Sequence, residues 1–251
     1  MTKLSVNLNK VALLRNSRSN GIPSIIHAAQ TCIKAGTHGI TVHPRPDERH
    51  IRRADVYELA ELLAGQPEIE FNIEGNPFPE FMQIVRETRP TQCTLVPDSP
   101  EAFTSDHGWE LGEHGERLKP IIEELKDTGI RVSLFMNPDS IQLQRAKEIG
   151  ADRIELYTEP YAAAYDGGES ETVFQQYARA AETARGVGLG VNAGHDLNLH
   201  NLEKFCSIPN ISEVSIGHAL VSDALEIGLF NAVQAYLRTL GYDERAALRG
   251  V

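Results

Sequence analysis

Residues 131–158 read RVSLFMNPDSIQLQRAKEIGADRIELYT, and the fold can be worked out from this stretch. Two short apolar or alternating segments, Arg131–Asn137 and Arg153–Thr158, lie on either side of a helical pattern at Asp139–Ile149. A strand, a helix and a second strand in this order are typical of a parallel β-α-β unit. We therefore expect a parallel sheet.

The same alternation continues in both directions along the chain. Further strands are expected at Leu4–Asn9, Gly39–His43, Ile69–Glu74, Cys93–Pro97, Leu189–Ala193 and Glu213–Gly217. Further helices are expected at Pro23–Ala35, Ala54–Leu63, Pro79–Thr88, Arg117–Thr128, Glu171–Gly186, Asn198–Phe205 and Val221–Leu240. Eight β-α units predict an α/β fold, a (β/α)8 TIM barrel with short extra helices, as one domain over residues 1–251. A doubly wound open sheet is the alternative, although no G-x-G-x-x-G follows the first strand.

One face of the predicted strands is unusually polar. Successive side chains point to opposite faces of a strand, and this parity separates an apolar set from a polar set in several strands. The polar sets include Ser5, Asn7 and Asn9, then Glu70, Asn72 and Glu74, and then Glu155, Tyr157 and Glu159. A purely structural barrel interior is mostly Val, Ile and Leu, and buried carboxylates are costly unless paired. The polar face therefore predicts a site at the C-terminal ends of the strands.

The net charge of −11 limits the classes of partner. A nucleic-acid-binding protein needs a basic face to displace counterions, so we expect no nucleic-acid partner. A small anionic ligand is compatible, because a pocket can differ in sign from the whole molecule. The three cysteines lie far apart, which argues against a disulfide framework or a zinc site. With no apolar leader and no run approaching about 18 apolar residues, we expect a cytoplasmic protein without a membrane partner.

Cationic and glycine-containing segments follow four of the predicted strands. The segment His43–Arg53 (HPRPDERHIRR) holds four arginines and favours capture of phosphate or carboxylate, mainly through Arg45 and His50. Arg15 and Arg18 follow the first strand, where one of them could add a second cation. The seventh and eighth strands each end in Gly-His, and a close backbone and a helix N-terminus there favour an anion. A solvated charge run and structural histidines are the alternatives.

Glu74 is the candidate acid/base group. A carboxylate at the end of the third strand, near His43 and His195, offers acid/base pairs that work near neutral pH. A fixed salt bridge to an arginine is the alternative. No metal is expected, because no H-E-x-x-H or comparable spacing occurs and a basic mouth disfavours a dication. Lys10 could form a Schiff base, but its strand parity does not require it to point inward.

The connection Asp98–Glu116 (DSPEAFTSDHGWELGEHGE) is long for this fold. Long loops in compact domains are usually lids or disordered inserts. We expect a lid over the barrel mouth that closes to exclude water from the reaction.

Taken together, several motifs resemble those of the pyridoxine 5′-phosphate synthase family. In chain order they are VNLNKVALLRNSR, GITVHPRPDERHI, NIEG, CTLVP, RVSLF, RIELYTEPYA, VNAGHDLNLHN and SIGHAL. The resemblance implies a (β/α)8 barrel that assembles into a homo-octamer and uses no metal or organic cofactor. It also implies an enzyme of the transferase type. The family condenses 3-amino-2-oxopropyl phosphate with 1-deoxy-D-xylulose 5-phosphate to give pyridoxine 5′-phosphate, inorganic phosphate and water.

The resemblance further implies roles for individual residues. The acid/base groups are His43 as proton acceptor, Glu74 as second acid/base group and His195 as proton donor. The residues that match contacts to deoxyxylulose phosphate are Arg45, His50 and Thr104. The residues that match groups around the aminoketone phosphate are Asn7, Arg18, Gly217 and His218.

The chain departs from the family pattern at three places. Asn9 and Lys10 stand where many members have Asp-His, among residues that contact the deoxyxylulose substrate. Asp196 stands where many members have glycine, which keeps a backbone contact but adds a carboxylate near a phosphate. Prolines on both sides of Arg45 stiffen its loop. Two other functions stay open: a sugar-phosphate isomerase or epimerase on the same barrel, and a non-catalytic phosphate-binding homologue.

Overall fold

The computed structural model describes residues 1–102 and 104–243, and it contains a closed barrel of parallel strands. The strands are β1 (Lys3–Asn7), β2 (Gly39–Val42), β3 (Glu70–Gly75), β4 (Gln92–Leu95), β5 (Arg131–Met136), β6 (Arg153–Tyr157), β7 (Gly190–Gly194) and β8 (Ile211–Ile216). They pair in chain order, and β8 closes the barrel against β1. The predicted TIM barrel is confirmed, and the open-sheet alternative is wrong. Phe103 of the predicted lid and residues 244–251 of the predicted domain lie outside the described residues.

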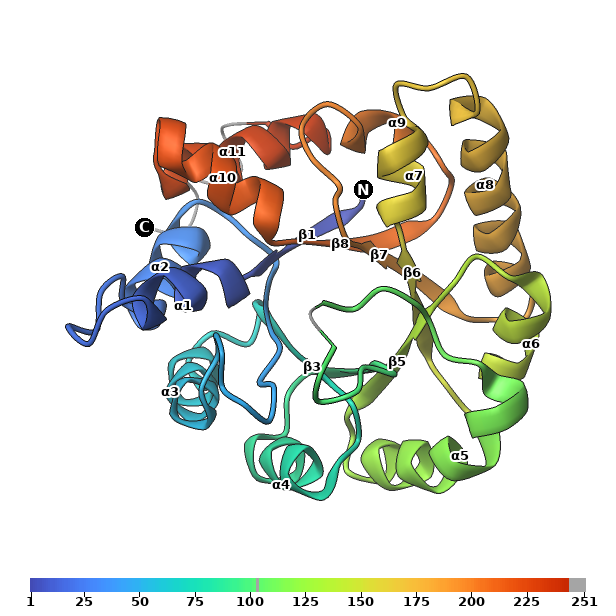
Figure 1. Cartoon of the computed structure of the whole chain (residues 1–251), viewed down its shortest axis with the longest axis horizontal. Helices are drawn as coiled ribbons and strands as arrows, with labels where there is room; N and C mark the ends of the chain where they lie inside the picture. The colour runs from blue at the N-terminus through green and yellow to red at the C-terminus, as the bar shows by residue number, and fades with distance from the viewer. Residues whose placement is uncertain (103, 244–251) are drawn as a thin grey trace.

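Helices surround the barrel on all sides (Figure 1). They are α1 (Asn9–Asn16), α2 (Ile25–Lys34), α3 (Arg53–Ala64), α4 (Pro79–Thr88), α5 (Leu111–Asp127), α6 (Ser140–Glu148), α7 (Glu159–Ala164), α8 (Ser170–Gly186), α9 (Leu202–Cys206), α10 (His218–Ile227) and α11 (Leu229–Thr239). Among the described residues, no helix is both long enough and apolar enough to cross a membrane.

Several element boundaries differ from the prediction, and three of them bear on the site. The first strand ends at Asn7, and the Asn7 side-chain oxygen accepts a hydrogen bond from the backbone N–H of Asn9 at 2.9 Å, where α1 begins. Helix α5 begins at Leu111, so the last third of the predicted lid is helical. The predicted last helix is divided at Gly228, whose φ of +81° is one that L residues rarely adopt. Helices α1 and α7 are additional.

The barrel interior is polar, whereas the layer between barrel and helices is apolar. Leu4 and Val6 of β1 are fully buried under the helices, and Ser5 between them bonds Thr41 inside the barrel at 2.7 Å. The predicted strand parity is therefore confirmed for β1. At the N-terminal end of the barrel, Glu70 forms ion pairs with Lys3 and Arg131. Pairing of this kind offsets the cost of burying polar groups.

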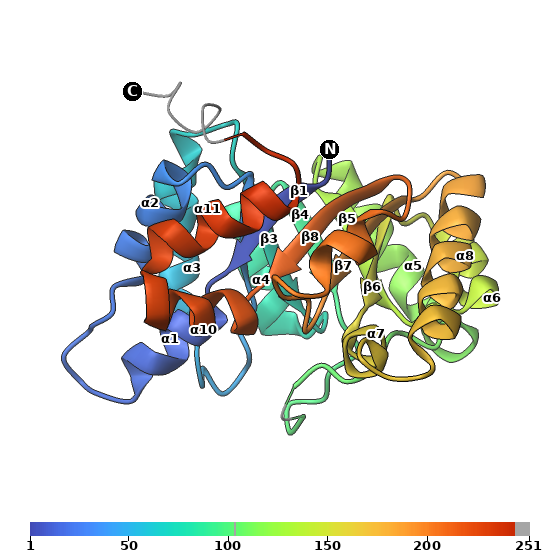
Figure 2. The same ribbon diagram turned by 90° about the horizontal axis from the view of Figure 1, so that it is seen from above.

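The strand ends carry this polar interior into the mouth of the barrel. In Figure 2 the green segment around residue 100 lies beyond the C-terminal ends of the strands, on the same side as α1 and α7. The loops that follow the strands therefore meet on one face, which is where this fold places its sites.

Candidate functional site

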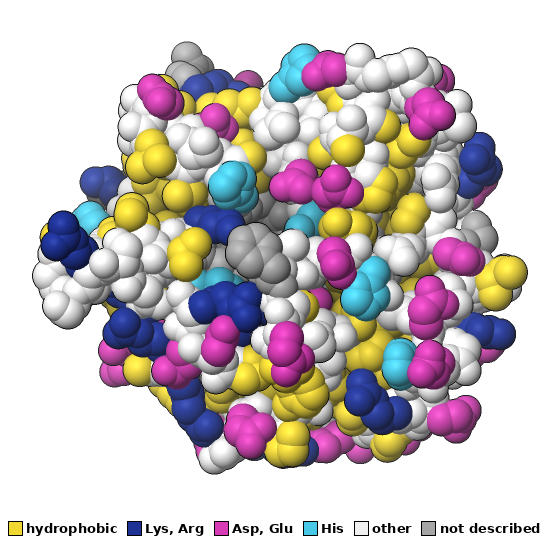
Figure 3. All heavy atoms as spheres, viewed as in Figure 1, with side chains coloured by type: hydrophobic (Ala, Val, Ile, Leu, Met, Phe, Trp, Pro, Cys, Tyr) yellow, Lys and Arg dark blue, Asp and Glu magenta, His cyan; other side chains and the backbone are white. Residues whose placement is uncertain are grey.

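A cavity of about 500 Å³ opens at the C-terminal ends of the strands. Figure 3 shows Lys, Arg and His side chains around the central hollow, with acidic side chains nearby. Nearly all of the predicted site residues line the cavity: Asn7, Asn9, Lys10, His43, Arg45, His50, Glu74, Thr104, His195, Asp196, Gly217 and His218. The structure thus brings together residues from both ends of the sequence.

The two arginines that follow β1, Arg15 and Arg18, do not line this cavity. Arg18 is exposed and is not among the described residues that line the cavity. Arg15 is buried and makes a bidentate ion pair with Asp55 of α3, so it is not the arginine that could add a cation to the mouth. Its Nη2 also donates to the backbone carbonyl of His50 at 3.1 Å. Arg15 therefore holds in place the loop that carries His50.

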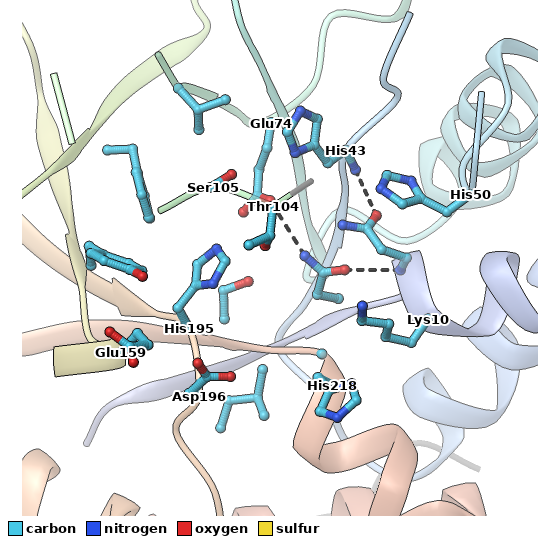
Figure 4. Close-up of a pocket in the computed structure, with 18 of the residues that line it drawn as sticks. Lys10, His43, His50, Glu74, Thr104, Ser105, Glu159, His195, Asp196 and His218 are labelled. Carbon is cyan, nitrogen blue, oxygen red and sulfur yellow. Dashed lines mark hydrogen bonds between the residues drawn. The ribbon is translucent and has the colours of Figure 1, made fainter. Parts of the chain in front are cut away.

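Two asparagines form a scaffold for the acid/base groups. Asn9 Oδ1 accepts a hydrogen bond from the backbone N–H of His43 at 2.9 Å, and Asn7 Nδ2 lies 3.4 Å from Glu74 Oε2 (Figure 4). Because Asn7 Oδ1 is already occupied by the N–H of Asn9, the amide nitrogen of Asn7 is the group that faces the carboxylate. The substrate contact predicted for Asn9 stays a prediction, and in the structure its side chain holds the backbone of His43.

One side of the cavity is cationic. Arg45 is buried, His50 and Lys10 are half-buried, and all three face the same space. Burial and the charges of Arg45 and Lys10 lower the pKa of His50 to about 4. Burial, followed by Arg45, lowers the pKa of His43 well below its usual value, so this imidazole is neutral at pH 7. In the part of the chain that the structure describes, the Lys10 ammonium has no hydrogen-bond or ion-pair partner.

Lys10 lies in the cavity because it belongs to the first turn of α1 rather than to β1. The alternation of side chains along a strand therefore does not apply to Lys10 and could not predict where its side chain points. Figure 4 shows its side chain between those of His50 and His218.

The floor of the cavity is acidic. Burial, followed by the charges of Asp98 and Glu213, raises the pKa of Glu74 to about 8, while Arg45 acts in the opposite direction. Glu155 of β6 is 3% exposed, and its Oε2 has no hydrogen-bond partner among the described residues. Burial, followed by the charge of Glu74, raises the pKa of Glu155 far above its usual value. Strand parity placed Glu155 inside the barrel, and it belongs to the motif RIELYTEPYA, but no role was predicted for it there.

His195 is held by an unusual backbone conformation. His195 and Asp196 have φ values of +83° and +59°, a left-handed region that non-glycine residues rarely adopt. Thr158 Oγ1 lies 2.5 Å from the His195 carbonyl, and Asn201 Nδ2 donates to the Asp196 carbonyl at 3.1 Å. The imidazole packs between the rings of Phe135 and Tyr157. Such strain, held by specific contacts, is common at functional sites.

Burial lowers the pKa of His195, and the neighbouring Asp196 carboxylate acts against this effect. The Asp196 carboxylate therefore helps His195 to keep a proton.

Gly194 provides the space that Glu155 occupies. A Cβ atom added at Gly194 would lie 2.2 Å from Glu155 Oε1. We expect Gly194→Ala to lower the free energy of unfolding by about 1–3 kcal/mol, because overpacking displaces this buried carboxylate. Urea denaturation measures the change, and Gly186→Ala is the control, since nothing lies within 4 Å of its added methyl group. Equal stability of the two variants would contradict this account.

The segment after β4 lies over the mouth and is held there by arginines. Asp98 forms a buried ion pair with Arg45 and accepts a hydrogen bond from Ser105 Oγ at 2.6 Å. Arg45 Nη1 and Arg49 Nη1 both donate to the carbonyl of Ala102 at 2.9 Å. This arrangement places Thr104 and Ser105 in the cavity wall. Of the predicted lid, Thr104 and Ser105 line the cavity, and its closing motion stays a prediction.

We expect Asp98→Asn to loosen this segment, because the buried Arg45 guanidinium loses its compensating charge. The cost is on the order of 3 kcal/mol of unfolding free energy. Hydrogen exchange of the amides of Ser99, Glu101 and Ala102 should become faster than in the wild type. Asp47→Asn is the matched control, since it removes a half-exposed partner of Arg49, where the cost is below about 1 kcal/mol. If hydrogen exchange is unchanged in Asp98→Asn, the ion pair of Asp98 with Arg45 does not hold this segment in place.

The cavity offers a second place for an anion at α10. Gly217 is the N-cap of this ten-residue helix, no side chain caps it, and both Gly217 and His218 line the cavity. Free backbone N–H groups and the helix dipole favour negative charge there. Among the described residues, no cluster of His, Cys, Asp or Glu is arranged to hold a metal ion.

The chain matches the family model described as "Pyridoxal phosphate biosynthesis protein PdxJ" over residues 4–241. It is 54% identical to pyridoxine 5′-phosphate synthase of Albidiferax ferrireducens, covering 95% of this chain and 97% of the relative. It is 52% identical to the enzyme of the same name from Xylella fastidiosa strain M23, covering 95% of each chain.

A solved structure of phosphoribosyl anthranilate isomerase from Thermus thermophilus resembles the chain in fold alone. Its TM-score is 0.59 at 13% identity, over 96% of this chain and 98% of that one. The family-model match over nearly the whole chain and the identity above 50% are much more specific than this likeness of fold. The chain therefore belongs to the PdxJ family of pyridoxal phosphate biosynthesis proteins.

Proposed function

We propose that the protein is a pyridoxine 5′-phosphate synthase, which condenses 3-amino-2-oxopropyl phosphate with 1-deoxy-D-xylulose 5-phosphate. The products are pyridoxine 5′-phosphate, inorganic phosphate and water. The observation that carries this proposal is one cavity that combines two separate anion-binding regions with a floor of buried acid/base groups. A reaction that joins two phosphorylated molecules by proton transfers needs these features in one place.

Each phosphate has its own region of the cavity. Arg45, His50 and Thr104 bind the phosphate of deoxyxylulose phosphate, and Lys10 supplies a further positive charge on that side. The N-terminus of α10 at Gly217 and His218, together with Asn7, binds the aminoketone phosphate. A helix N-terminus and a guanidinium both recognise phosphate, but only the guanidinium carries a full charge.

Proton transfer takes place between these regions. The amine of the aminoketone adds to the ketone of deoxyxylulose phosphate, and loss of water gives an imine. His43, kept neutral by burial and by Arg45, accepts a proton, and Glu74 accepts or returns one near neutral pH. His195 donates a proton to a leaving hydroxyl or phosphate, supported by the charge of Asp196. The segment after β4 excludes water from the imine.

The test mixes the purified protein with both substrates and follows pyridoxine phosphate absorbance and free phosphate together. Stoichiometric release of both products, unaffected by a chelator, supports the proposal. Turnover of one substrate alone, or loss of activity with a chelator, points instead to a sugar-phosphate isomerase. If both substrates bind without product while a relative with Asp-His at positions 9 and 10 works in parallel, the protein is a non-catalytic homologue.

The proposal extends to organisation in the cell. The chain forms a single barrel domain, assembles as a homo-octamer and works in the cytoplasm. Exposed apolar side chains on α1, α10 and α11 support an assembly that covers them: Leu13, Leu14, Leu225, Ile227 and Phe230. Three free cysteines, two of them buried, support a reducing compartment. Analytical ultracentrifugation tests the octamer, and a monomer at micromolar concentration would overturn it.

A further inference from the structure

A continuous line of hydrogen bonds runs inside the barrel from its N-terminal end to Glu74. Arg131 Nε donates to Gln92 Oε1 at 2.8 Å, and Gln92 Nε2 lies 3.4 Å from Thr94 Oγ1. Thr94 Oγ1 donates to Asn72 Oδ1 at 2.9 Å, and Asn72 Nδ2 lies 3.5 Å from Glu74 Oε1. The middle three residues are at most 2% exposed. The line therefore crosses β5, β4 and β3 away from solvent.

The direction of this line is determined by its first member. A guanidinium can only donate hydrogen bonds, so the side-chain oxygen of Gln92 must face Arg131. The amide nitrogen of Gln92 then faces Thr94, and the Thr94 hydroxyl uses its single hydrogen for Asn72 Oδ1. This leaves the amide nitrogen of Asn72 to donate its two hydrogens to Glu74 Oε1 and to Thr41 Oγ1, which lies 3.3 Å away. The same oxygen of Gln92 also accepts from Asn192 Nδ2 at 3.3 Å, which strengthens this orientation.

From this geometry we propose that Thr94 is a positioning residue for the proposed reaction, and that it keeps the amide N–H of Asn72 directed at Glu74. An N–H donor next to a carboxylate favours the ionised form, which is the form that accepts a proton. A flipped Asn72 would place its carbonyl oxygen against the carboxylate and favour the protonated acid instead. Thr94 itself lines β4 inside the barrel and is not among the residues that line the cavity.

Few other groups support the ionised form of Glu74. Arg45 lowers its pKa, and Asn7 Nδ2 is the other nearby amide donor. Burial and the acids Asp98 and Glu213 raise its pKa, and the acid Glu155 and the thiol Cys93 also lie within its electrostatic reach. With burial and two acids acting against two amide donors and one cation, we expect the orientation of a single amide to have a measurable effect.

The experiment compares Thr94→Val with Thr94→Ser. Valine has the shape of threonine without its hydroxyl, whereas serine keeps the hydroxyl. In Thr94→Val we expect the acidic limb of the kcat/KM profile to move to higher pH by about one unit, because a group that must be ionised then titrates later. At a pH on that limb, kcat falls about tenfold while KM for both substrates stays within about twofold. Thr94→Ser should retain the wild-type limb.

A second readout does not depend on activity. The carboxyl carbon of Glu74, followed by ¹³C NMR in protein labelled at glutamate and assigned with Glu74→Gln, should titrate later in Thr94→Val than in the wild type or Thr94→Ser. This inference rests on the proposed function, but a wild type that makes no product would overturn the function while the NMR titration still tests the positioning.

Two results would overturn the positioning role. One is an unshifted Glu74 titration in Thr94→Val, and the other is an equal shift in Thr94→Val and Thr94→Ser. Far-UV circular dichroism and thermal unfolding check the fold of each variant. If the valine variant does not fold, Thr94→Ala makes the same deletion with more room for the neighbouring amides, and the same criteria apply to it.

Discussion

Replacing His195 with asparagine is expected to lower kcat by about 10²- to 10⁴-fold, while both phosphorylated substrates still bind. The His195 ring packs against Phe135 and Tyr157 at the end of β7, and the neighbouring Asp196 carboxylate helps it to hold a proton. Asparagine fits the same space and forms hydrogen bonds, but it cannot deliver a proton at neutral pH. The other residues proposed to bind phosphate, Arg45, His50, Thr104, Gly217 and His218, lie on other loops.

Turnover is measured by the release of phosphate and pyridoxine 5′-phosphate, and binding by isothermal titration with each substrate alone. His200→Asn is the matched control, because His200 lies in the same loop but is 69% exposed and pairs with Asp166. Its turnover should equal that of the wild type. Unchanged turnover in His195→Asn would remove this histidine from the mechanism, and loss of binding in the same variant would assign it to substrate recognition instead.

The sequence is sufficient to predict the barrel because the signals for it are local. The period of two along β1 and β3 separates the apolar and polar faces, and the structure keeps this division. The helical patterns between the strands depend only on neighbouring residues. For the same reason the motifs at the strand ends predict most of the cavity, since the carboxyl ends of all strands in a closed parallel barrel meet on one face.

Two of the failures arise where a distant residue decides, and the third arises where the first strand ends two residues earlier than predicted. Arg15 was a candidate mouth cation, but its partner Asp55 lies 40 residues away and draws it under α3. Glu155 has the parity of a barrel residue, yet its isolation depends on Gly194 of the adjacent strand, which leaves room for its carboxylate. Lys10 was assigned strand parity, although the hydrogen bond from Asn9 to Asn7 starts a helix before it. None of these contacts follows from a repeating pattern of residues in the sequence.

Glu74→Gln is expected to have opposite effects on turnover and on stability. Turnover should fall by about 10²- to 10⁴-fold, because glutamine can neither accept nor return a proton. Above pH 7 the variant should be more stable than the wild type. The folded protein raises the pKa of this carboxyl from its ordinary value of 4.5 to about 8, mainly by burial. Between these two values the folded state binds more protons than the unfolded state, so the wild type loses stability as pH rises from about 4.5 to 8.

Glutamine does not ionise, so the variant is free of this loss. The difference in melting temperature between Glu74→Gln and the wild type should therefore grow from pH 5 to pH 8 and then level off, as measured by differential scanning calorimetry. Glu123→Gln on α5 is the control, because Glu123 is exposed and should change neither turnover nor the slope with pH. A difference that stays constant over this range would show that Glu74 ionises as easily in the folded protein as in the unfolded chain. That result would leave it without the raised proton affinity on which its role near neutral pH depends.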